Sequence, residues 1–385
     1  MKRVLLVAAL VFTAVGVASA TESSGSRDFK VAAGGKLTLE LKTGGGVKIA
    51  GTGGSSVTVS YKLSCSPDCG IEFTQSGSDV RVETKYQSGQ HSQTSNIELE
   101  IRVPSRYDVA IDSMGGGLSI DGVTGAFSGE TKGGEISLHD VEGEAKLKTM
   151  GGEISVKDST LDGSVSTMGG EVTIENVTGN VKGSSMGGNV SYKNVRRTDG
   201  KLASPPNTGG ADGAEVGPET VQISTMGGEI NTDDAPEGAD VMTMGGNITV
   251  KNAGKFVRAK TMGGDIKLDA VDGWVKATTM GGNIDVALKG GGGDVELTSM
   301  SGTVVLHVPS GFGMNLDLEI AFTKNSSKEY TITAPGGGAP SVSPDWDYSQ
   351  GSARKYIRKS AAVGGGGHKV TIKTVNGDIT VVADR

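Results

Sequence analysis

A column of acidic and amide side chains is the feature of this sequence best suited to chemistry. It consists of the residue after each of eight Gly-Gly pairs: Glu135, Glu153, Glu171, Asn189, Glu229, Asn247, Asp265 and Asn283. Five of these residues carry carboxylates, whose oxygens are the ligands that calcium and magnesium prefer. If the residues stack about 4.8 Å apart, the carboxylates Glu135, Glu153, Glu171, Glu229 and Asp265 could bind a cation or a cationic partner. The alternative, which we favour, is a solvated face whose asparagines hydrogen-bond along the stack.

A methionine stands directly before most of the same Gly-Gly pairs. The members of this second column are Met150, Met168, Met186, Met226, Met244, Met262 and Met280. Methionine is flexible and fills irregular gaps, so we expect it to pack at a corner of the fold. The alternative is an exposed stripe for partners or for soft metals, which thioethers bind.

Signatures of catalysis are missing from the sequence. The histidines His91, His139, His307 and His368 are isolated, with no metal-binding or nucleophile motif around them. The acidic residues are spread along the chain instead of being concentrated at one point. The calcium-binding repeat Gly-Gly-x-Gly-x-Asp is also absent. We therefore predict no enzyme, no catalytic residue and no cofactor, apart from calcium or magnesium at the acidic column.

The two cysteines, Cys65 and Cys69, lie on either side of Ser66-Pro67-Asp68. A pair this close, across a turn that contains proline, predicts a local disulfide. Half of a metal site is the rival interpretation, but no second cysteine pair and no nearby histidine complete it. Closing so small a loop contributes about 2 kcal/mol in the chain-entropy description.

The Gly-Gly pairs recur with a spacing that predicts a repeat. Their first glycines are Gly115, Gly133, Gly151, Gly169, Gly187, Gly227, Gly245, Gly263 and Gly281. Successive starts follow an 18-residue period, and the exception is the step from Gly187 to Gly227, which is longer than two periods. Residues 196–219 contain Pro205-Pro206 and lack the pattern, so we expect an inserted loop there.

Each repeat contains two alternating stretches, which predict two short strands. In one copy Ile154 and Val156 alternate with polar residues, and Val165 and Thr167 do the same. Asp158 follows the first stretch, and aspartate or asparagine tolerates the left-handed backbone of a turn. The equivalent residues are Asp140, Asn176, Asn194, Asp234 and Asn252. Two such strands cannot bury an apolar face alone, so successive repeats must stack.

The composition fits a narrow core built in this way. The 385 residues include 63 glycines, 4% aromatic and 35% hydrophobic residues, which favours many short strands lined by small β-branched side chains. We predict an all-β fold, a parallel β-solenoid (β-helix) of 18-residue coils with N- and C-terminal β caps. The expected parts are a signal peptide at 1–20, the N-terminal β cap at 21–113, the solenoid repeats at 114–303 with the loop at 196–219, and the C-terminal β cap at 304–385.

The first twenty residues have the layout of an export signal. Lys2 and Arg3 precede an apolar run, and Ala18-Ser19-Ala20 forms a cleavage site. We therefore expect a periplasmic, cell-surface or extracellular protein with no transmembrane segment after cleavage. The formal charge of −7 argues against nucleic acid as a partner.

Several phrases of the sequence together resemble the bacterial putative-adhesin β-strand-repeat family, a domain of unknown function. They are residues 44–49 (Gly-Gly-Gly-Val-Lys-Ile), Ile101-Arg102-Val103-Pro104, the repeated Gly-Gly phrases and the closing residues 374–379 (Thr-Val-Asn-Gly-Asp-Ile). The resemblance covers residues 29–382. It implies an exported solenoid with an adhesive or envelope role.

These observations predict a non-catalytic, exported, adhesion-type binding protein that presents a rigid repeat rod to a surface or envelope macromolecule. The alternative is a structural envelope scaffold whose solenoids associate laterally or end to end. The expected end caps speak against end-to-end growth, because they cover the strand edges. The sequence leaves the oligomeric state, the coil handedness, the ligand and the role of loop 196–219 open.

Overall fold

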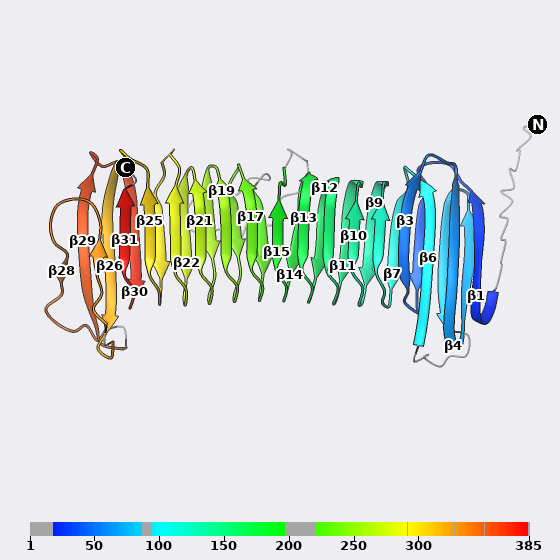
Figure 1. The fold of residues 1–385 in the computed structure, drawn as a ribbon, viewed down its shortest axis with the longest axis horizontal. Helices are drawn as coiled ribbons and strands as arrows, with labels where there is room; N and C mark the ends of the chain where they lie inside the picture. The colour runs from blue at the N-terminus through cyan, green and yellow to red at the C-terminus, as the bar shows by residue number, and fades with distance from the viewer. Residues whose placement is uncertain are drawn as a thin grey trace, which may run out of the picture. The chain divides into compact units, whose positions relative to one another are not determined.

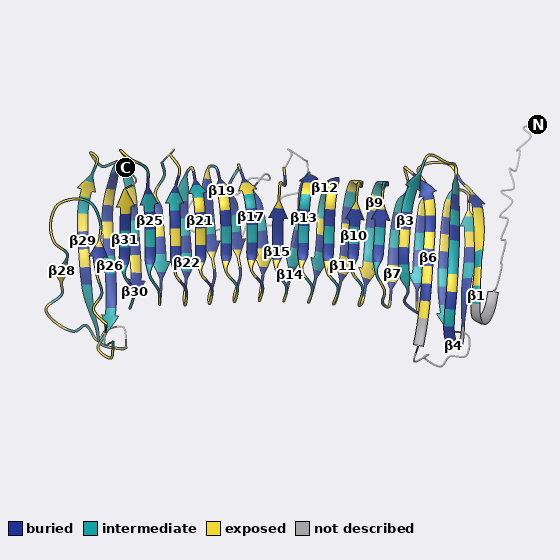
Figure 2. Cartoon of the chain, viewed as in Figure 1, coloured by how far each residue is buried: buried dark blue, intermediate teal, exposed yellow. Residues whose placement is uncertain are grey.

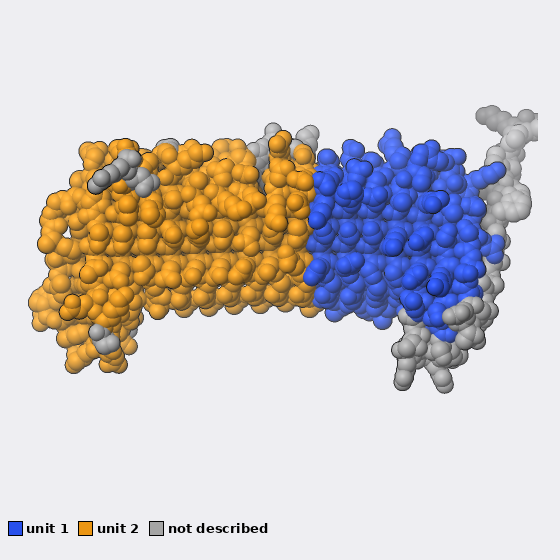
Figure 3. Space-filling view, viewed as in Figure 1, with its two compact units in different colours: residues 1–167 blue, residues 168–385 orange. Residues whose placement is uncertain are grey.

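The computed structural model describes residues 18–86, 94–196, 220–290, 292–326, 328–349 and 351–383. All regular structure in these residues is β-strand, which confirms the all-β prediction. They contain no helix long and apolar enough to cross a membrane. The chain divides into two compact units, residues 1–167 and 168–385 (Figure 3). Residues 1–17 of the predicted signal peptide and residues 197–219 of the predicted loop lie outside the described residues.

Strands β1 to β12 make up the described part of unit 1 (Figure 1). Their bounds are β1 Ala18–Lys30, β2 Lys36–Leu41, β3 Gly46–Thr52, β4 Ser56–Ser76, β5 Asp79–Tyr86, β6 Thr94–Pro104, β7 Asp108–Ser113, β8 Leu118–Asp121, β9 Thr124–Thr131, β10 Ile136–His139, β11 Glu142–Thr149 and β12 Ile154–Thr167.

Two parallel series of strands run through unit 1. One series is β5–β2–β7–β9–β11–β12 and the other is β6–β3–β8–β10–β12. At the start of both series β4 pairs antiparallel with β5 and β6, and β1 pairs antiparallel with β4. Since β4 joins both series, it covers their outer strands. The parallel stack therefore already begins within residues 36–52.

Strands β13 to β31 make up the described part of unit 2. Their bounds are β13 Val172–Thr178, β14 Val181–Ser185, β15 Val190–Lys193, β16 Val221–Thr225, β17 Ile230–Ala235, β18 Ala239–Met242, β19 Ile248–Ala253, β20 Phe256–Lys260, β21 Ile266–Val271, β22 Trp274–Thr279, β23 Ile284–Leu288, β24 Val295–Ser299, β25 Val304–Val308, β26 Met314–Thr323, β27 Ile332–Thr333, β28 Ser341–Val342, β29 Arg354–Val363, β30 His368–Val375 and β31 Ile379–Ala383.

Unit 2 also contains two parallel series, and the chain order changes near their end. One series runs β13–β15–β17–β19–β21–β23–β25–β31–β27. The other runs β14–β16–β18–β20–β22–β24–β30–β26. The last strands of the chain, β30 and β31, thus lie between β24–β25 and β26–β27. Antiparallel β29 and β28 complete the second series.

The core of each unit is a set of buried apolar columns. Within unit 2, Ile230 faces Ile248, Ile248 faces Ile266 and Ile266 faces Ile284, all at most 1% exposed. Side chains of a strand alternate between the two faces, so the residues between them point outward. Figure 2 shows this alternation as bands along the strands. The stacking of successive repeats predicted from the sequence is therefore present within unit 2.

The turn prediction is confirmed for four residues and wrong for two. Asp140, Asp158, Asn176 and Asn194 have φ values of 50°, 49°, 55° and 49°. Asp234 of β17 and Asn252 of β19 pair with each other in register. Neither residue has a positive φ, and the β17–β19 pairing continues through them to Ala235 and Ala253.

Candidate functional site: the methionine corner

The most regular surface feature of unit 2 is the turn that connects the two series of strands. We call it the methionine corner. It comprises residues 168–171, 186–189, 226–229, 244–247, 262–265 and 280–283, each with the sequence Met-Gly-Gly followed by Glu, Asn or Asp. Residues 300–303, Met-Ser-Gly-Thr, add a seventh copy. A buried Thr or Ser directly precedes each copy, at the end of one strand or immediately after it. The next strand begins directly after each copy with a buried Ile or Val.

A buried hydroxyl group fixes each turn. The Thr261 hydroxyl donates to the Gly246 carbonyl of the previous copy (2.9 Å), and the Gly264 N–H donates to Thr261 Oγ1 (3.2 Å). The same donation occurs at Thr225, Thr243, Thr279, Ser185 and Ser299. A buried hydroxyl needs such partners to offset its desolvation. Sequence reasoning treated this threonine only as a strand residue and missed its contacts.

The two glycines of each turn have different roles. A Cβ atom on Gly246 would overlap the Gly228 carbonyl oxygen of the copy below. The fold therefore requires glycine at the second position. A Cβ on Gly245 would lie 3.4 Å from its nearest atom, Gly227 O, which is ordinary contact, and Gly245 does not have a positive φ. Ser301 occupies the first position in the seventh copy, so a side chain fits there.

The methionines of the corner are exposed, so the corner-packing expectation is wrong. The seven side chains in unit 2, at Met168, Met186, Met226, Met244, Met262, Met280 and Met300, are 40–50% exposed. Their backbones stack directly, because the N–H groups of Met226, Met244 and Met262 each donate to the methionine carbonyl one copy below at 3.2 Å. We call this set the methionine column. The thioethers cannot pack inside because the preceding Thr or Ser already points into the core.

Amides and carboxylates alternate in the polar column of unit 2. From Asn189 to Asn283 the order is amide, Glu229, Asn247, Asp265, amide. The Asn247 amide donates to Glu229 Oε1 (3.1 Å), and Asn247 Oδ1 accepts the Asp265 N–H (2.9 Å). Asp265 Oδ1 accepts the Asn283 N–H at 2.7 Å. Each of these two carboxylates thus lies between two amides, which separates the negative charges.

The remaining acidic residues of the predicted column are divided between the units. Glu135 and Glu153 belong to unit 1, where they directly precede the adjacent parallel strands β10 and β12, and both are exposed. Glu171 belongs to unit 2, where its carboxylate accepts a hydrogen bond from Thr173 (3.2 Å). No group of three or more His, Cys, Asp and Glu side chains in the described ranges is placed to hold a metal. Cation binding by this column stays a prediction.

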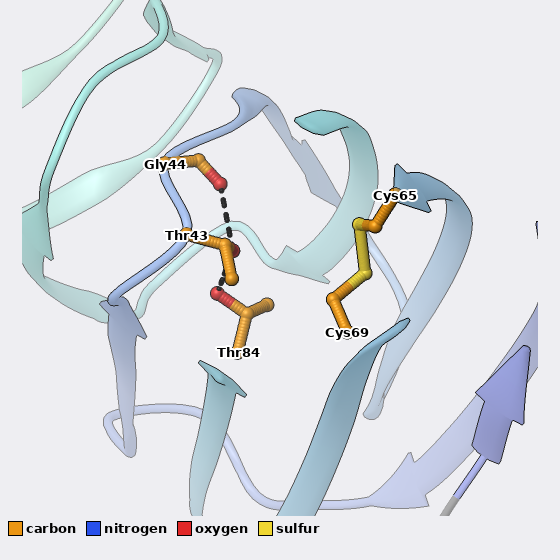
Figure 4. The surroundings of a disulfide bond; sticks show 5 residues. All are labelled: Thr43, Gly44, Cys65, Cys69 and Thr84. Carbon is orange, nitrogen blue, oxygen red and sulfur yellow. Dashed lines mark hydrogen bonds between the residues drawn. A yellow bond between two sulfur atoms is a disulfide. The ribbon is translucent and has the colours of Figure 1, made fainter. Parts of the chain in front are cut away.

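The predicted disulfide is confirmed. Cys65 and Cys69 are bonded and buried, with their Cα atoms 5.8 Å apart. Residues of β4 up to Ser66 pair with β6, and those from Cys69 onward pair with β5, so the bond lies where β4 changes partner. Figure 4 shows the bond and, in its surroundings, the hydrogen-bonded hydroxyls of Thr43 and Thr84 (2.6 Å). Its role is therefore structural.

A second surface feature is a depression of about 480 Å³ on the outer face of β22, β24 and β30. Trp274 lines it and stacks on Phe256, with ring centroids 4.9 Å apart. Two carboxylates reach it, but both have structural partners. Glu296 pairs with Lys276 (3.3 Å), and Asp294 accepts the Lys369 N–H (2.8 Å). This depression is formed by one set of residues, whereas the methionine corner is repeated along unit 2.

Stacked parallel strands, an exposed repeated corner and a structural disulfide define a repeat protein of the all-β class. The chain belongs to the Toastrack DUF4097 family, whose sequence model matches residues 35–382. This confirms the resemblance inferred from the sequence. No protein of curated function matches it.

Several solved structures are similar to the chain at low identity. A putative cell adhesion protein from Clostridium sporogenes is 11% identical, over 94% of this chain and 100% of that one, with a TM-score of 0.17. A putative adhesin from Bacteroides fragilis is 15% identical, over 67% and 97%, with a TM-score of 0.29. A putative lipid binding protein from Parabacteroides distasonis is 10% identical, over 93% and 96%, with a TM-score of 0.18.

Proposed function

We propose that this chain is an exported, non-catalytic binding protein whose binding surface is the methionine corner of unit 2. The exposed methionine column is the observation that carries the proposal. Ten of the thirteen exposed large apolar side chains in the described residues are methionines, and seven of these form the column. A contiguous apolar surface of this kind marks an interaction site, whereas scattered exposed side chains do not.

The glycine pair supports the same assignment. In the six copies with a Gly-Gly pair, the first glycine is exposed and the second is half-buried or buried, so the strip between the methionine and polar columns has no side chains there. A partner can therefore approach the backbone between a thioether edge and an amide-carboxylate edge. Methionine adapts its shape to different partners, which suits such a surface. The partner is an envelope or cell-surface macromolecule.

The proposal includes the solenoid architecture of 18-residue coils with a cap at each end. Parallel partners that follow the repeat period, such as Ile136 with Ile154 and Val257 with Val275, support 18-residue coils. Antiparallel β1 and β4 in unit 1, and β28 and β29 in unit 2, support caps within residues 21–113 and 304–385. Residues 1–20 would be the export signal and residues 196–219 an insertion. Caps of this kind cover the strand edges and so prevent end-to-end association. If the chain is a structural scaffold instead, its solenoids would therefore associate laterally.

We propose that the chain is non-catalytic because the carboxylates that could act as general acids or bases already have structural partners. A general acid or base must be available to a substrate, within hydrogen-bond reach. Glu296 and Asp294 in the Trp274 depression instead contact Lys276 and the Lys369 backbone. Glu229 and Asp265 are held between amides of the polar column. Calcium or magnesium at Glu135 and Glu153 of unit 1 is a secondary proposal, tested by a rise in Tm on adding either ion.

Sedimentation with isolated envelopes of the producing bacterium tests the proposed function. Metal-free purified chain should bind saturably, and a variant with Met226→Gln, Met244→Gln and Met262→Gln should bind about tenfold more weakly, a loss of about 1.4 kcal/mol. The matched control is Val342→Gln with Tyr348→Gln, which changes exposed apolar side chains outside the column and should bind normally. Absence of saturable binding, or equal binding by all three proteins, contradicts the proposal.

A further inference from the structure

We infer that the methionine column of unit 2 is a binding site for soft monovalent metal ions of the Cu(I) class, each held between thioethers of adjacent copies. The inference deepens the proposed function, because it rests on the same exposed column being the binding surface. Thioether sulfur is a soft ligand and selects Cu(I) over hard cations. The column supplies seven such sulfurs in consecutive copies.

The spacing of the column suits two-coordinate ions. Direct hydrogen bonds between Met186, Met226, Met244 and Met262 fix these residues in register, one copy above the next. Parallel strands in such a stack lie about 4.8 Å apart. A metal–sulfur distance of about 2.3 Å, as for zinc thiolates, puts the two sulfurs of a linear site about 4.6 Å apart. Adjacent thioethers can thus share an ion without movement of the backbone.

The repeated use of methionine indicates that the column requires the sulfur atom and not only an apolar side chain. An apolar edge could be built equally from leucine, isoleucine or valine. The polar residue three positions later is Glu, Asn or Asp in six copies and Thr in the seventh, and the core residue after it is Ile or Val. The methionine position does not vary in any of the seven copies in unit 2. A position that stays methionine while the polar and core positions of the same turn vary indicates a role for the thioether.

The surroundings of the column favour a cation and present no competing thiol. Glu171, Glu229 and Asp265 lie three residues after Met168, Met226 and Met262, and they supply negative charge that neutral thioethers lack. Both cysteines of the chain are joined in the disulfide, so no thiolate competes for a soft ion. In six of the seven copies the methionine is followed by an exposed glycine, which has no side chain.

Ag(I), a redox-stable probe with the same ligand preference, tests the inference in calorimetric titrations of the purified full chain. Seven adjacent thioethers make three pairs, so about three ions should bind tightly. The variant Met186→Leu, Met244→Leu, Met280→Leu leaves four column methionines, none on adjacent copies. Leucine replaces methionine at nearly equal volume, so the fold should persist. The affinity of this variant for Ag(I) should fall at least about tenfold at every site, or tight Ag(I) binding should be lost altogether.

The matched control removes the same number of sulfurs but keeps neighbours. The variant Met168→Leu, Met186→Leu, Met226→Leu leaves four consecutive methionines and should retain about two tight ions. Equal loss by the two variants, or no uptake by the parent chain, overturns the inference. Because the titration contains no envelope material and the sedimentation assay contains no metal, failure of one does not imply failure of the other.

Discussion

Gly246 and Thr243 differ from Gly245 and Met244 in what the fold requires of them. Gly246 has no room for a side chain, and the Thr243 hydroxyl is bonded to the Gly228 carbonyl (2.9 Å). Gly245 has room, and Met244 is about half exposed. The first two residues build the stack, while the other two form the surface of the corner.

Gly246→Ala and Gly245→Ala should therefore have opposite effects on stability. The Cβ added by Gly246→Ala would overlap Gly228 O, and such overpacking costs about 1–3 kcal/mol. The Cβ added by Gly245→Ala fits, so the lower entropy of the unfolded chain should stabilise the protein by roughly 0.4–1 kcal/mol. Urea unfolding of both variants measures the difference. Equal destabilisation by the two substitutions would contradict the different roles assigned to the two glycines.

Residue types alone could predict part of this corner. The glycine spacing predicted where each turn lies, because the pair recurs with an 18-residue period. It could not predict the exposure of the methionines, since a flexible thioether suits a core gap and a surface equally well. The bonds of Thr225, Thr243 and Thr261 were also hidden, because threonine is common in strands without any special contact.

At the scale of elements, local sequence patterns could not predict the pairing of the long strand β4 or of the last strands of the chain. β4 pairs with both β5 and β6, and the Cys65–Cys69 bond marks the change of partner. β30 and β31 lie between strands that precede them in sequence. Period and alternation predict strands but carry no information on such non-local pairing, so the sequence could not place these elements.

His139, at the end of β10 in unit 1, joins three neighbouring strands and predicts a pH effect. Its Nδ1 lies 2.6 Å from the Asp121 carboxylate of β8, and its Nε2 lies 3.5 Å from Asp158 of β12. The hydrogen bond with Asp121, with added attraction from Asp121, Asp158 and Asp140, raises the pKa of His139 above 6.5. Its contribution to stability should be fully present below pH 6.5 and be lost as the pH rises through the raised pKa.

An NMR titration of the His139 ring checks this effect. Asp121→Asn should lower the pKa of His139 toward 6.5. It should also destabilise the chain more at pH 5.5 than at pH 8, two values that lie about one unit or more below and above the usual histidine pKa. Asp112→Asn, an exposed acid on β7, is the control and should leave the titration unchanged. A His139 pKa that does not respond to Asp121→Asn would refute the proposed coupling between the strands.

At the scale of the whole molecule, each unit combines a parallel stack with antiparallel strands at one end. The repeat predicted the parallel strands because an 18-residue period with alternating apolar residues has few other solutions. Parallel pairing already involves residues 21–113, predicted as an N-terminal cap, since β2 pairs with β7 and β3 pairs with β8 of residues 118–121. The turn between β2 and β3 contains Gly44 and Gly45 but no methionine, and it lies outside the 18-residue spacing.

Oxidation of the methionines by hydrogen peroxide, mapped by mass spectrometry on free and envelope-bound chain, tests the central claim most directly. Free chain should oxidise at all seven column methionines, about tenfold faster than at Met314, which is 1% exposed. Envelope-bound chain should show protection of the column and an unchanged rate at Met314. Column methionines that oxidise equally fast in both states, or as slowly as Met314 in the free chain, would contradict a binding surface at the methionine corner.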